Sequence, residues 1–88
     1  MSYAYTPITI VVADDHPIIR DGFNILLKNQ NEIQLIGQGE NGKELIDIVR
    51  QLKLDVAIVD IKMPVMDGVE ACKLITQEFP TTQVIAFS

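Results

Sequence analysis

Short apolar segments of strand length alternate along the chain with segments whose apolar residues recur at helical spacing. Ile8–Ala13 is rich in β-branched residues and apolar on both faces, which is typical of a strand buried in the middle of a sheet. The segment 56–59, which ends at Asp60, has the same character. Apolar and polar residues alternate loosely in the segment 33–37, which indicates a strand nearer an edge. The apolar run Gln83–Phe87 predicts a fourth strand.

Three helices are predicted between these strands. Pro17 suits the first helical position, where its missing N–H would have no partner, and this helix is expected to run to about Asn29. The second helix follows a turn at residues 39–42, and Pro80 ends the third. Apolar residues at helical spacing mark the expected inner faces: Ile18, Ile19, Gly22, Phe23, Ile25, Leu26 and Leu27 in the first helix; Leu45, Ile46, Val49 and Leu52 in the second; Val69, Cys72, Ile75 and Phe79 in the third.

This alternation predicts the α/β class, with a parallel sheet covered by helices on both faces. Right-handed crossovers restrict the possible topologies strongly. The chain stops on a strand whose own crossover helix is absent. We interpret this as an incomplete α/β unit of four strands and three helices; a minimal four-stranded domain is the alternative.

Composition narrows the functional classes. A chain of 88 residues is one domain at most, and 48% hydrophobic with 22% charged residues indicates a globular protein. The net charge of −5, with seven scattered basic residues, argues against nucleic-acid binding by this chain itself. We find no apolar run long enough for a membrane span and no signal peptide, so we expect a cytoplasmic protein.

Acidic residues follow the two most apolar strands. Asp14 and Asp15 come directly after the first strand, Asp60 ends the third, and the hydroxyl residue Ser88 follows the fourth. Parallel sheets form their sites outside the carboxyl ends of the strands, so three carboxylates would converge if the first and third strands are neighbours. Crowded like charges cost free energy unless a cation lies between them, and Mg²⁺ prefers carboxylate oxygens. An aspartate beside such a cation can accept a phosphoryl group.

Each of these residues also has a purely structural interpretation. Asp14 and Asp15 could cap the helix that begins near Pro17. Asp60 could merely end a strand. His16, the only histidine, could be a metal ligand or a solvated residue of the first turn, and Lys62 could offer its side chain or its backbone carbonyl. The single cysteine, Cys72, is expected to be a small buried apolar residue.

Three runs of residues resemble the receiver domains of two-component response regulators. They are Val-Val-Ala-Asp14-Asp15-His16-Pro17, Val-Asp60-Ile-Lys-Met-Pro-Val-Met-Asp67-Gly68 and Val-Ile-Ala-Phe-Ser88. The Asp-Asp-His-Pro run is especially similar to the NarL/FixJ-type subgroup, whose members carry a C-terminal helix-turn-helix domain. The resemblance covers the chain from about Thr9 to Ser88 and depends on the spacing of all three runs.

The resemblance implies a doubly wound, flavodoxin-like sheet with the strand order 2-1-3-4, counted along the chain. It implies that Asp60 is the phosphoacceptor, and that a sensor histidine kinase is the phosphoryl donor. Asp15 would bind Mg²⁺ (or Mn²⁺) directly, Asp14 through water and Lys62 through its backbone carbonyl. Ser88 would be the hydroxyl that moves to meet the phosphoryl group.

The chain departs from the family pattern at its end. Receivers have a fifth strand, which ends in a lysine that pairs with the phosphoryl oxygens, and two further helices. We therefore expect residues 1–88 to be a receiver domain without its last strand and last two helices, and without the output domain. Strand four would be an unpaired edge and the first helix would expose apolar surface, so we expect self-association through one of them.

Two other functional readings remain open. The same fold could serve as an interaction or dimerisation module that does not depend on phosphorylation. A hydrolase of the aspartate-nucleophile phosphatase type would need a second aspartate two residues after the first, where this chain has Lys62. We therefore expect a regulator rather than a turnover enzyme.

Overall fold

A computed structural model describes residues 7–87, which form a parallel sheet of four strands joined by three helices. The elements in chain order are β1 (Ile8–Ala13), α1 (Pro17–Leu27), β2 (Ile33–Gly39), α2 (Gly42–Gln51), β3 (Val56–Asp60), α3 (Gly68–Glu78) and β4 (Gln83–Phe87). The strand order is β2-β1-β3-β4, which confirms the predicted order and the α/β class.

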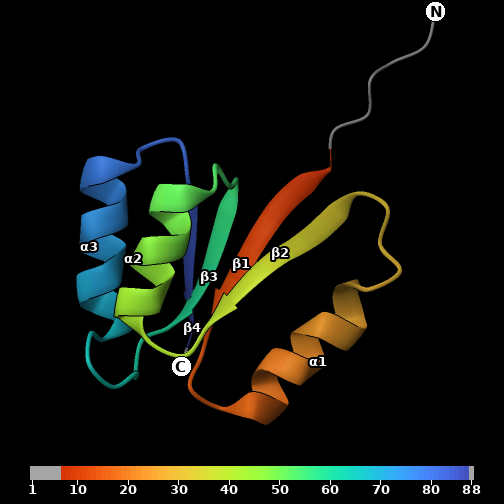
Figure 1. Cartoon of the computed structure of the whole chain (residues 1–88), viewed down its shortest axis with the longest axis horizontal. Coiled ribbons are helices and arrows are strands. Elements are labelled where there is room, and N and C mark those ends of the chain that lie inside the picture. The colour runs from red at the N-terminus through yellow and green to blue at the C-terminus, as the bar shows by residue number, and fades with distance from the viewer. Residues whose placement is uncertain (1–6, 88) are drawn as a thin grey trace, which may run out of the picture.

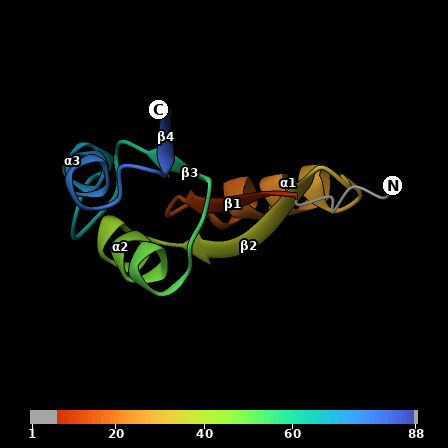
Figure 2. The same ribbon diagram turned by 90° about the horizontal axis from the view of Figure 1, so that it is seen from above.

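The helices lie on opposite faces of the sheet. α2 and α3 pack side by side against one face, and α1 lies against the other (Figures 1 and 2). All four strands run in the same direction, so their carboxyl ends meet at one edge, at the bottom of Figure 1. The register pairs Ala13 with Val59, which brings the ends of β1 and β3 next to each other.

The hydrophobic core lies between the sheet and the α2–α3 layer. β1 is buried from Ile10 to Ala13, as expected for a central strand. The core consists of aliphatic side chains, with Met63 from the loop after β3. Its buried members are Val11, Ala13, Leu45, Ile46, Val49, Leu54, Ala57, Val59, Met63, Ala71 and Ile75.

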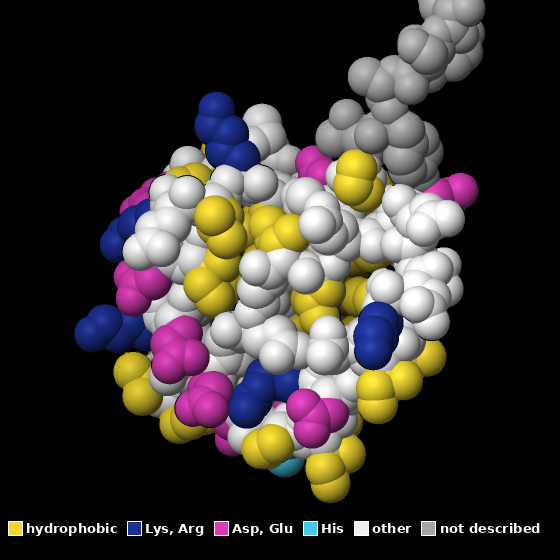
Figure 3. Space-filling view, turned by 45° about the vertical axis from the view of Figure 1, so that its right-hand side comes forward, with side chains coloured by type: hydrophobic (Ala, Val, Ile, Leu, Met, Phe, Trp, Pro, Cys, Tyr) yellow, Lys and Arg dark blue, Asp and Glu magenta, His cyan; other side chains and the backbone are white. Residues whose placement is uncertain are grey.

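The α1 side of the sheet is covered much less completely. No residue of α1 is buried, and Ile18 is 82% exposed, Ile25 73% and Leu26 69%. Phe23 makes the inward contact, with its ring 6.1 Å from that of Phe87 on β4. Hydrophobic side chains are visible at the lower right of the surface in Figure 3, where Figure 1 draws α1. The expected exposure of apolar surface on the first helix is confirmed.

Several expected boundaries and inner positions were wrong. α1 ends at Leu27 rather than about Asn29, and β2 continues to Gly39 rather than ending at residue 37. Residues 62–68 match the composition of a loop in the sequence, yet Gly68 is the first residue of α3. Leu52 is not an inner residue of α2, because the chain leaves the helix there and its side chain is 41% exposed. Val69 is 51% exposed, since it lies in the first turn of α3 and points away from the core. Cys72 is half-buried rather than buried.

The helices α2 and α3 begin with side-chain caps. Oδ1 of Asn41 accepts a hydrogen bond from the N–H of Glu44, and Oδ1 of Asp67 accepts one from the N–H of Glu70, each at 2.9 Å. Each cap satisfies a backbone donor that has no partner within its helix. Both caps lie at the carboxyl edge of the sheet, so they fix the loops that surround the acidic residues.

The opposite, amino edge of the sheet is held by side-chain hydrogen bonds. The carboxylate of Asp55 accepts from the backbone N–H of Thr9 at 2.9 Å and from its hydroxyl at 3.2 Å. The N–H of Asp55 donates in return to the Thr9 hydroxyl at 3.0 Å. Nearby, the buried hydroxyl of Thr82 donates to the Leu54 carbonyl at 2.9 Å. These bonds join β1, β3 and β4 at the end remote from the acidic residues.

Candidate functional site

Two carboxylates are buried where the adjacent strands β1 and β3 end. The side chain of Asp14 is 1% exposed and that of Asp60 is 7% exposed. Asp14 directly follows the apolar strand β1, and Asp60 is the last residue of β3. Burying a charge is costly unless it is paired or bound to a cation. The predicted convergence of the acidic residues at the carboxyl edge is confirmed.

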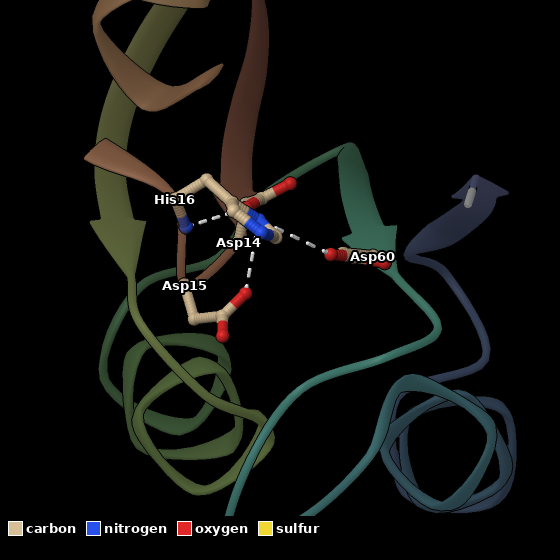
Figure 4. Close-up of side chains that lie close together, drawn as sticks. All are labelled: Asp14, Asp15, His16 and Asp60. Atoms are coloured by element: carbon tan, nitrogen blue, oxygen red, sulfur yellow. Dashed lines mark hydrogen bonds and ion pairs between the residues drawn. The ribbon is translucent and has the colours of Figure 1, made fainter. Parts of the chain in front are cut away.

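Asp15 and His16 complete a compact cluster with these two residues. One ligand atom from each of Asp14, Asp15, His16 and Asp60 lies within 4.8 Å of the others. Figure 4 shows Asp15 beside Asp14 and His16, and the imidazole ring of His16 extending from the loop after β1 toward Asp60. Three carboxylates in so small a volume form a site suited to a hard divalent cation.

Among the described residues of this cluster, His16 is the one whose side chain becomes positively charged when it is protonated. Its Nδ1 atom lies 2.7 Å from Oδ1 of Asp14, 3.1 Å from Oδ1 of Asp15 and 3.9 Å from Oδ2 of Asp60. The hydrogen bond with Asp14 and the negative charge of Asp15 raise the pKa of His16 above its ordinary value of 6.5. Sequence analysis left the role of His16 open, and the structure directs its ring into the acidic cluster.

The capping interpretation of the acidic pair does not hold for α1. The N-cap position is His16, and its side chain makes no capping hydrogen bond. Oδ1 of Asp14 accepts from the N–H of His16 at 2.7 Å, so Asp14 fixes the tight turn before the helix. Pro17 is at the start of the helix, as predicted.

The loop after β3 runs below the cluster in the view of Figure 4. The backbone N–H of Lys62 donates to Oδ1 of Asp60 at 3.0 Å, which fixes the carboxylate of Asp60. The N–H of Gly68 donates to the Ile61 carbonyl at 3.1 Å, and the N–H of Gly42 donates to the Met66 carbonyl at 3.0 Å. Val65 at the tip of this loop has a φ of 70°, a left-handed conformation that is uncommon for a β-branched residue.

Arg20 supports the site from α1, and sequence analysis did not single it out. Its Nη1 donates to the backbone carbonyl of Asp14 at 2.6 Å, and its Nη2 lies 3.3 Å from Oε1 of Glu40. The guanidinium therefore joins the ends of β1 and β2 beside the cluster. Its position six residues after Asp14 matches no general motif, so the sequence offered no signal for it.

Ser88, predicted as the hydroxyl of the site, lies outside the described residues. Its neighbour Phe87 is paired with Asp60 in the sheet, and the N–H of Ile61 donates to the Phe87 carbonyl at 2.9 Å. The end of β4 is thus adjacent to the end of β3.

Among residues 7–87, no helix is long and apolar enough to cross a membrane.

Comparison with known proteins identifies the family. The sequence profile of the response regulator receiver domain matches residues 10–88. The chain is 35% identical over 79 residues to the uncharacterized transcriptional regulatory protein YhcZ of Bacillus subtilis, covering 90% of this chain and 37% of the relative. The chain belongs to the response regulator receiver domain family, which confirms the resemblance found in the sequence.

Solved structures agree with this assignment. The response regulator domain of Thermotoga maritima CheB superimposes with a TM-score of 0.86 at 32% identity, over 92% of this chain and 60% of that one. RcsB from Salmonella enterica serovar Typhimurium, bound to promoter rprA in the presence of the phosphomimetic BeF3−, gives 0.81 at 30% identity, over 90% and 67%. The chain spans little more than a third of the length of its curated relative YhcZ.

Proposed function

We propose that this chain is a phosphoacceptor module of two-component signal transduction and that Asp60 receives the phosphoryl group from a sensor histidine kinase. The observation that carries this proposal is the buried carboxylate of Asp60 beside Asp14 and Asp15 at the ends of adjacent strands. A carboxylate oxygen of Asp60 attacks phosphorus, the bond from phosphorus to the donor atom breaks, and the donor leaves with the bonding electrons.

A divalent cation, Mg²⁺ or Mn²⁺, is the cofactor that fits this set of donors. The cation would be held by the carboxylates of Asp14, Asp15 and Asp60 and by the backbone carbonyl of Lys62. Ser88 would supply the hydroxyl that meets the phosphoryl group. The oxygen atoms present are those that Mg²⁺ prefers. When bound, the cation offsets negative charge on the transferred group. The N–H of Lys62 donates to Oδ1 of Asp60, which fixes the orientation of the carboxylate that would accept the phosphoryl group.

Within a longer protein, this chain would act as a switch for a C-terminal DNA-binding domain. Phosphorylation adds charge at Asp60 and biases two existing conformations of the domain. The similarity to RcsB, whose promoter complex was solved with a phosphomimetic, supports this role. We propose a cytoplasmic regulator that is not a turnover enzyme.

Phosphorylation by acetyl phosphate tests the proposal directly. The chain is incubated with acetyl phosphate with and without Mg²⁺, and intact mass spectrometry measures the fraction that carries one added phosphoryl group. We expect Mg²⁺-dependent labelling that Asp60→Asn abolishes. Asp21→Asn is the matched control, because Asp21 is exposed on α1 and outside the cluster, and it should be labelled like the unsubstituted chain.

The assignment of Asp60 fails if Asp60→Asn is labelled as fast as the unsubstituted chain. The absence of labelling in the unsubstituted chain, with Mg²⁺ binding intact, contradicts a phosphoacceptor function for residues 1–88. It would favour the second candidate, a module that associates without phosphorylation.

The exposed apolar face of α1 is the observation that favours this second candidate. Ile18, Ile25 and Leu26 are each more than two-thirds exposed, and within residues 7–87 β4 pairs with β3 alone. Buried apolar surface drives association between proteins, and an open strand edge can pair with another chain.

Sedimentation over a concentration series separates the two surfaces. Ile25→Glu places a charge on the α1 face, and Ile85→Lys places one on β4, where Ile85 is 55% exposed. We expect self-association that one of these variants abolishes. A monomer at every concentration would contradict the second candidate.

A further inference from the structure

Arg20 is covered more completely than several apolar residues of its own helix. Its side chain is 14% exposed, whereas Ile18, Ile25 and Leu26 are each more than two-thirds exposed. A surface helix ordinarily turns its apolar residues inward and its charged residues toward solvent. α1 reverses this order at Arg20, and a residue that breaks a local rule in this way often belongs to a functional site.

The two arms of the guanidinium reach the ends of two different strands. Nη1 of Arg20 donates to the backbone carbonyl of Asp14 at 2.6 Å, after β1, and Nη2 donates to Oε1 of Glu40 at 3.3 Å, after β2. The side-chain amide of Gln38 donates to the backbone carbonyl of Arg20 at 2.9 Å. Arg20 is therefore held between β1 and β2, with its charge paired to that of Glu40.

The carbonyl that Arg20 contacts belongs to the peptide group between Asp14 and Asp15. Because a peptide group is planar, its orientation relates the two backbone positions from which these carboxylates extend. Oδ1 of Asp14 accepts a hydrogen bond from the N–H of His16, and the His16 carbonyl accepts one from the N–H of Arg20 at 3.2 Å. Arg20 therefore holds the turn at residues 14–16 through two carbonyl groups, one with its side chain and one with its backbone.

From this arrangement we infer that Arg20 is a positioning residue for the cation site, because its guanidinium orients the peptide group between Asp14 and Asp15. In this orientation one oxygen of each carboxylate lies within 4.8 Å of an oxygen of Asp60. The inference rests on the proposed function and adds a residue of α1 to it. Arg20 contacts a backbone carbonyl and not the reacting groups, so it acts on cation affinity and leaves the phosphoryl-transfer step unchanged.

The coupling between Arg20 and the cation acts in both directions. If Arg20 strengthens cation binding, a bound cation strengthens the contact between Arg20 and Asp14 by the same free energy. No residue of α1 is buried, so few contacts attach this helix to the sheet. Cation binding should therefore tighten the attachment of α1.

Titration calorimetry of the 88-residue chain with Mg²⁺ measures the effect of Arg20. Residues that hold metal ligands in position typically contribute about 10–100-fold to metal affinity, so Arg20→Met should weaken Mg²⁺ binding about tenfold or more. Arg20→Lys keeps the charge but offers one nitrogen in place of the planar fork, and it should be weakened nearly as much. Arg50→Met is the matched control. Arg50 pairs with Glu78 at 3.5 Å near the opposite edge of the sheet, and its loss should leave Mg²⁺ affinity unchanged.

Two further measurements separate positioning from a purely structural role. Labelling by acetyl phosphate should need about tenfold more Mg²⁺ in Arg20→Met, yet its rate at saturating Mg²⁺ should stay within about threefold of that of the unsubstituted chain. Saturating Mg²⁺ should also slow the hydrogen exchange of the α1 amides in the unsubstituted chain. In Arg20→Met this slowing should be much smaller, because the link from α1 to Asp14 is lost.

A milder pair of variants keeps the inference testable if circular dichroism shows that Arg20→Met does not fold. Glu40 is exposed, and Glu40→Ala frees one arm of the guanidinium, whereas Glu40→Gln loses the same charge and keeps an oxygen acceptor. Glu40→Ala should bind Mg²⁺ more weakly than Glu40→Gln. Equal affinities in this pair would overturn the positioning role.

The outcomes distinguish this inference from the proposed function. If the unsubstituted chain binds Mg²⁺ and is labelled, but Arg20→Met has the same Mg²⁺ affinity, Arg20 is not a positioning residue and the proposed function stands. Full affinity in Arg20→Lys would assign the effect to charge and likewise overturn positioning. If the unsubstituted chain binds Mg²⁺ without being labelled, the phosphoacceptor function fails and calorimetry alone decides the role of Arg20. If it binds no Mg²⁺, the metal site and the role of Arg20 are both overturned.

Discussion

Gly68 lies so close to the backbone carbonyl of Asp60 that a Cβ atom at this position would overlap it. The first residue of α3 thereby rests directly on the end of β3, where the proposed phosphoacceptor is located. The neighbouring atoms belong to the backbone of Asp60 and Ile61, so they cannot turn aside as a flexible side chain would.

Gly68→Ala is expected to destabilise the chain by about 1–3 kcal/mol, because the added methyl group forces a backbone shift in a packed region. Gly22→Ala is the matched control. Gly22 is inside α1 with no atom within 4 Å of the added Cβ, so alanine should stabilise the chain by about 0.5–1 kcal/mol. Urea unfolding measures both changes. Equal effects of the two substitutions would contradict the close approach at Gly68.

Mg²⁺ is expected to stabilise the folded chain, since the acidic cluster exists only when β1 and β3 are paired. At a Mg²⁺ concentration 100 times the dissociation constant, the free energy of unfolding should rise by about 2.7 kcal/mol. Asp60→Asn removes one of three clustered charges while an amide oxygen still accepts the N–H of Lys62. This variant should unfold at a higher urea concentration without Mg²⁺ and respond much less to its addition. A response as large as that of the unsubstituted chain would remove Asp60 from the metal site.

The thiol of Cys72 provides a pH-dependent test of the packing of α3. Burial raises the pKa of Cys72 above its ordinary value, because the thiolate is poorly solvated there. A group whose pKa is raised in the folded state stabilises it below the unfolded pKa, and this contribution is lost as the pH rises through the folded pKa. The reaction rate with a thiol reagent should therefore reach half its maximum at a higher pH in the folded chain than in urea. Coincident pH profiles would mean that the thiol is fully solvated.

The cap of α3 should contribute measurably to stability. Asp67→Ala leaves the N–H of Glu70 without its partner, and we expect a loss of about 1 kcal/mol in the free energy of unfolding. Asp67→Asn keeps an oxygen acceptor and should lose much less. If the two variants lose the same amount, the charge of Asp67 rather than its cap would be the stabilising feature.

The sequence predicted the central strands well because two segments are uniformly apolar, and a central, parallel position buries both of their faces. The order of the strands came from the resemblance to receiver domains and not from the apolar pattern. The sequence predicted the acidic site because each carboxylate directly follows one of those two segments. The sequence was a less accurate guide to which helical residues are buried, because burial depends on the tertiary structure. Val69 and Leu52 match the helical period, yet Val69 lies in the first turn of α3 and Leu52 is the residue at which the chain leaves α2, and both side chains are exposed.

The environment of the site was harder to infer than its carboxylates. Arg20 donates to the backbone carbonyl of Asp14. Every residue type has such a carbonyl, so no sequence pattern predicts this contact. For His16 the sequence indicated proximity to the carboxylates but not the direction of the ring. That direction depends on the extended backbone before Pro17 and on the hydrogen bond from Asp14.

The reciprocal hydrogen bonds between Thr9 and Asp55 have a practical consequence for measuring any change at the site. They hold β1 and β3 together at the end of the sheet opposite the carboxylates. A spectroscopic label near Thr9 and Asp55 would serve as a fixed reference position. A second label would be placed in the loop at residues 62–67. A change in the distance between the two labels would then report movement of that loop relative to the sheet.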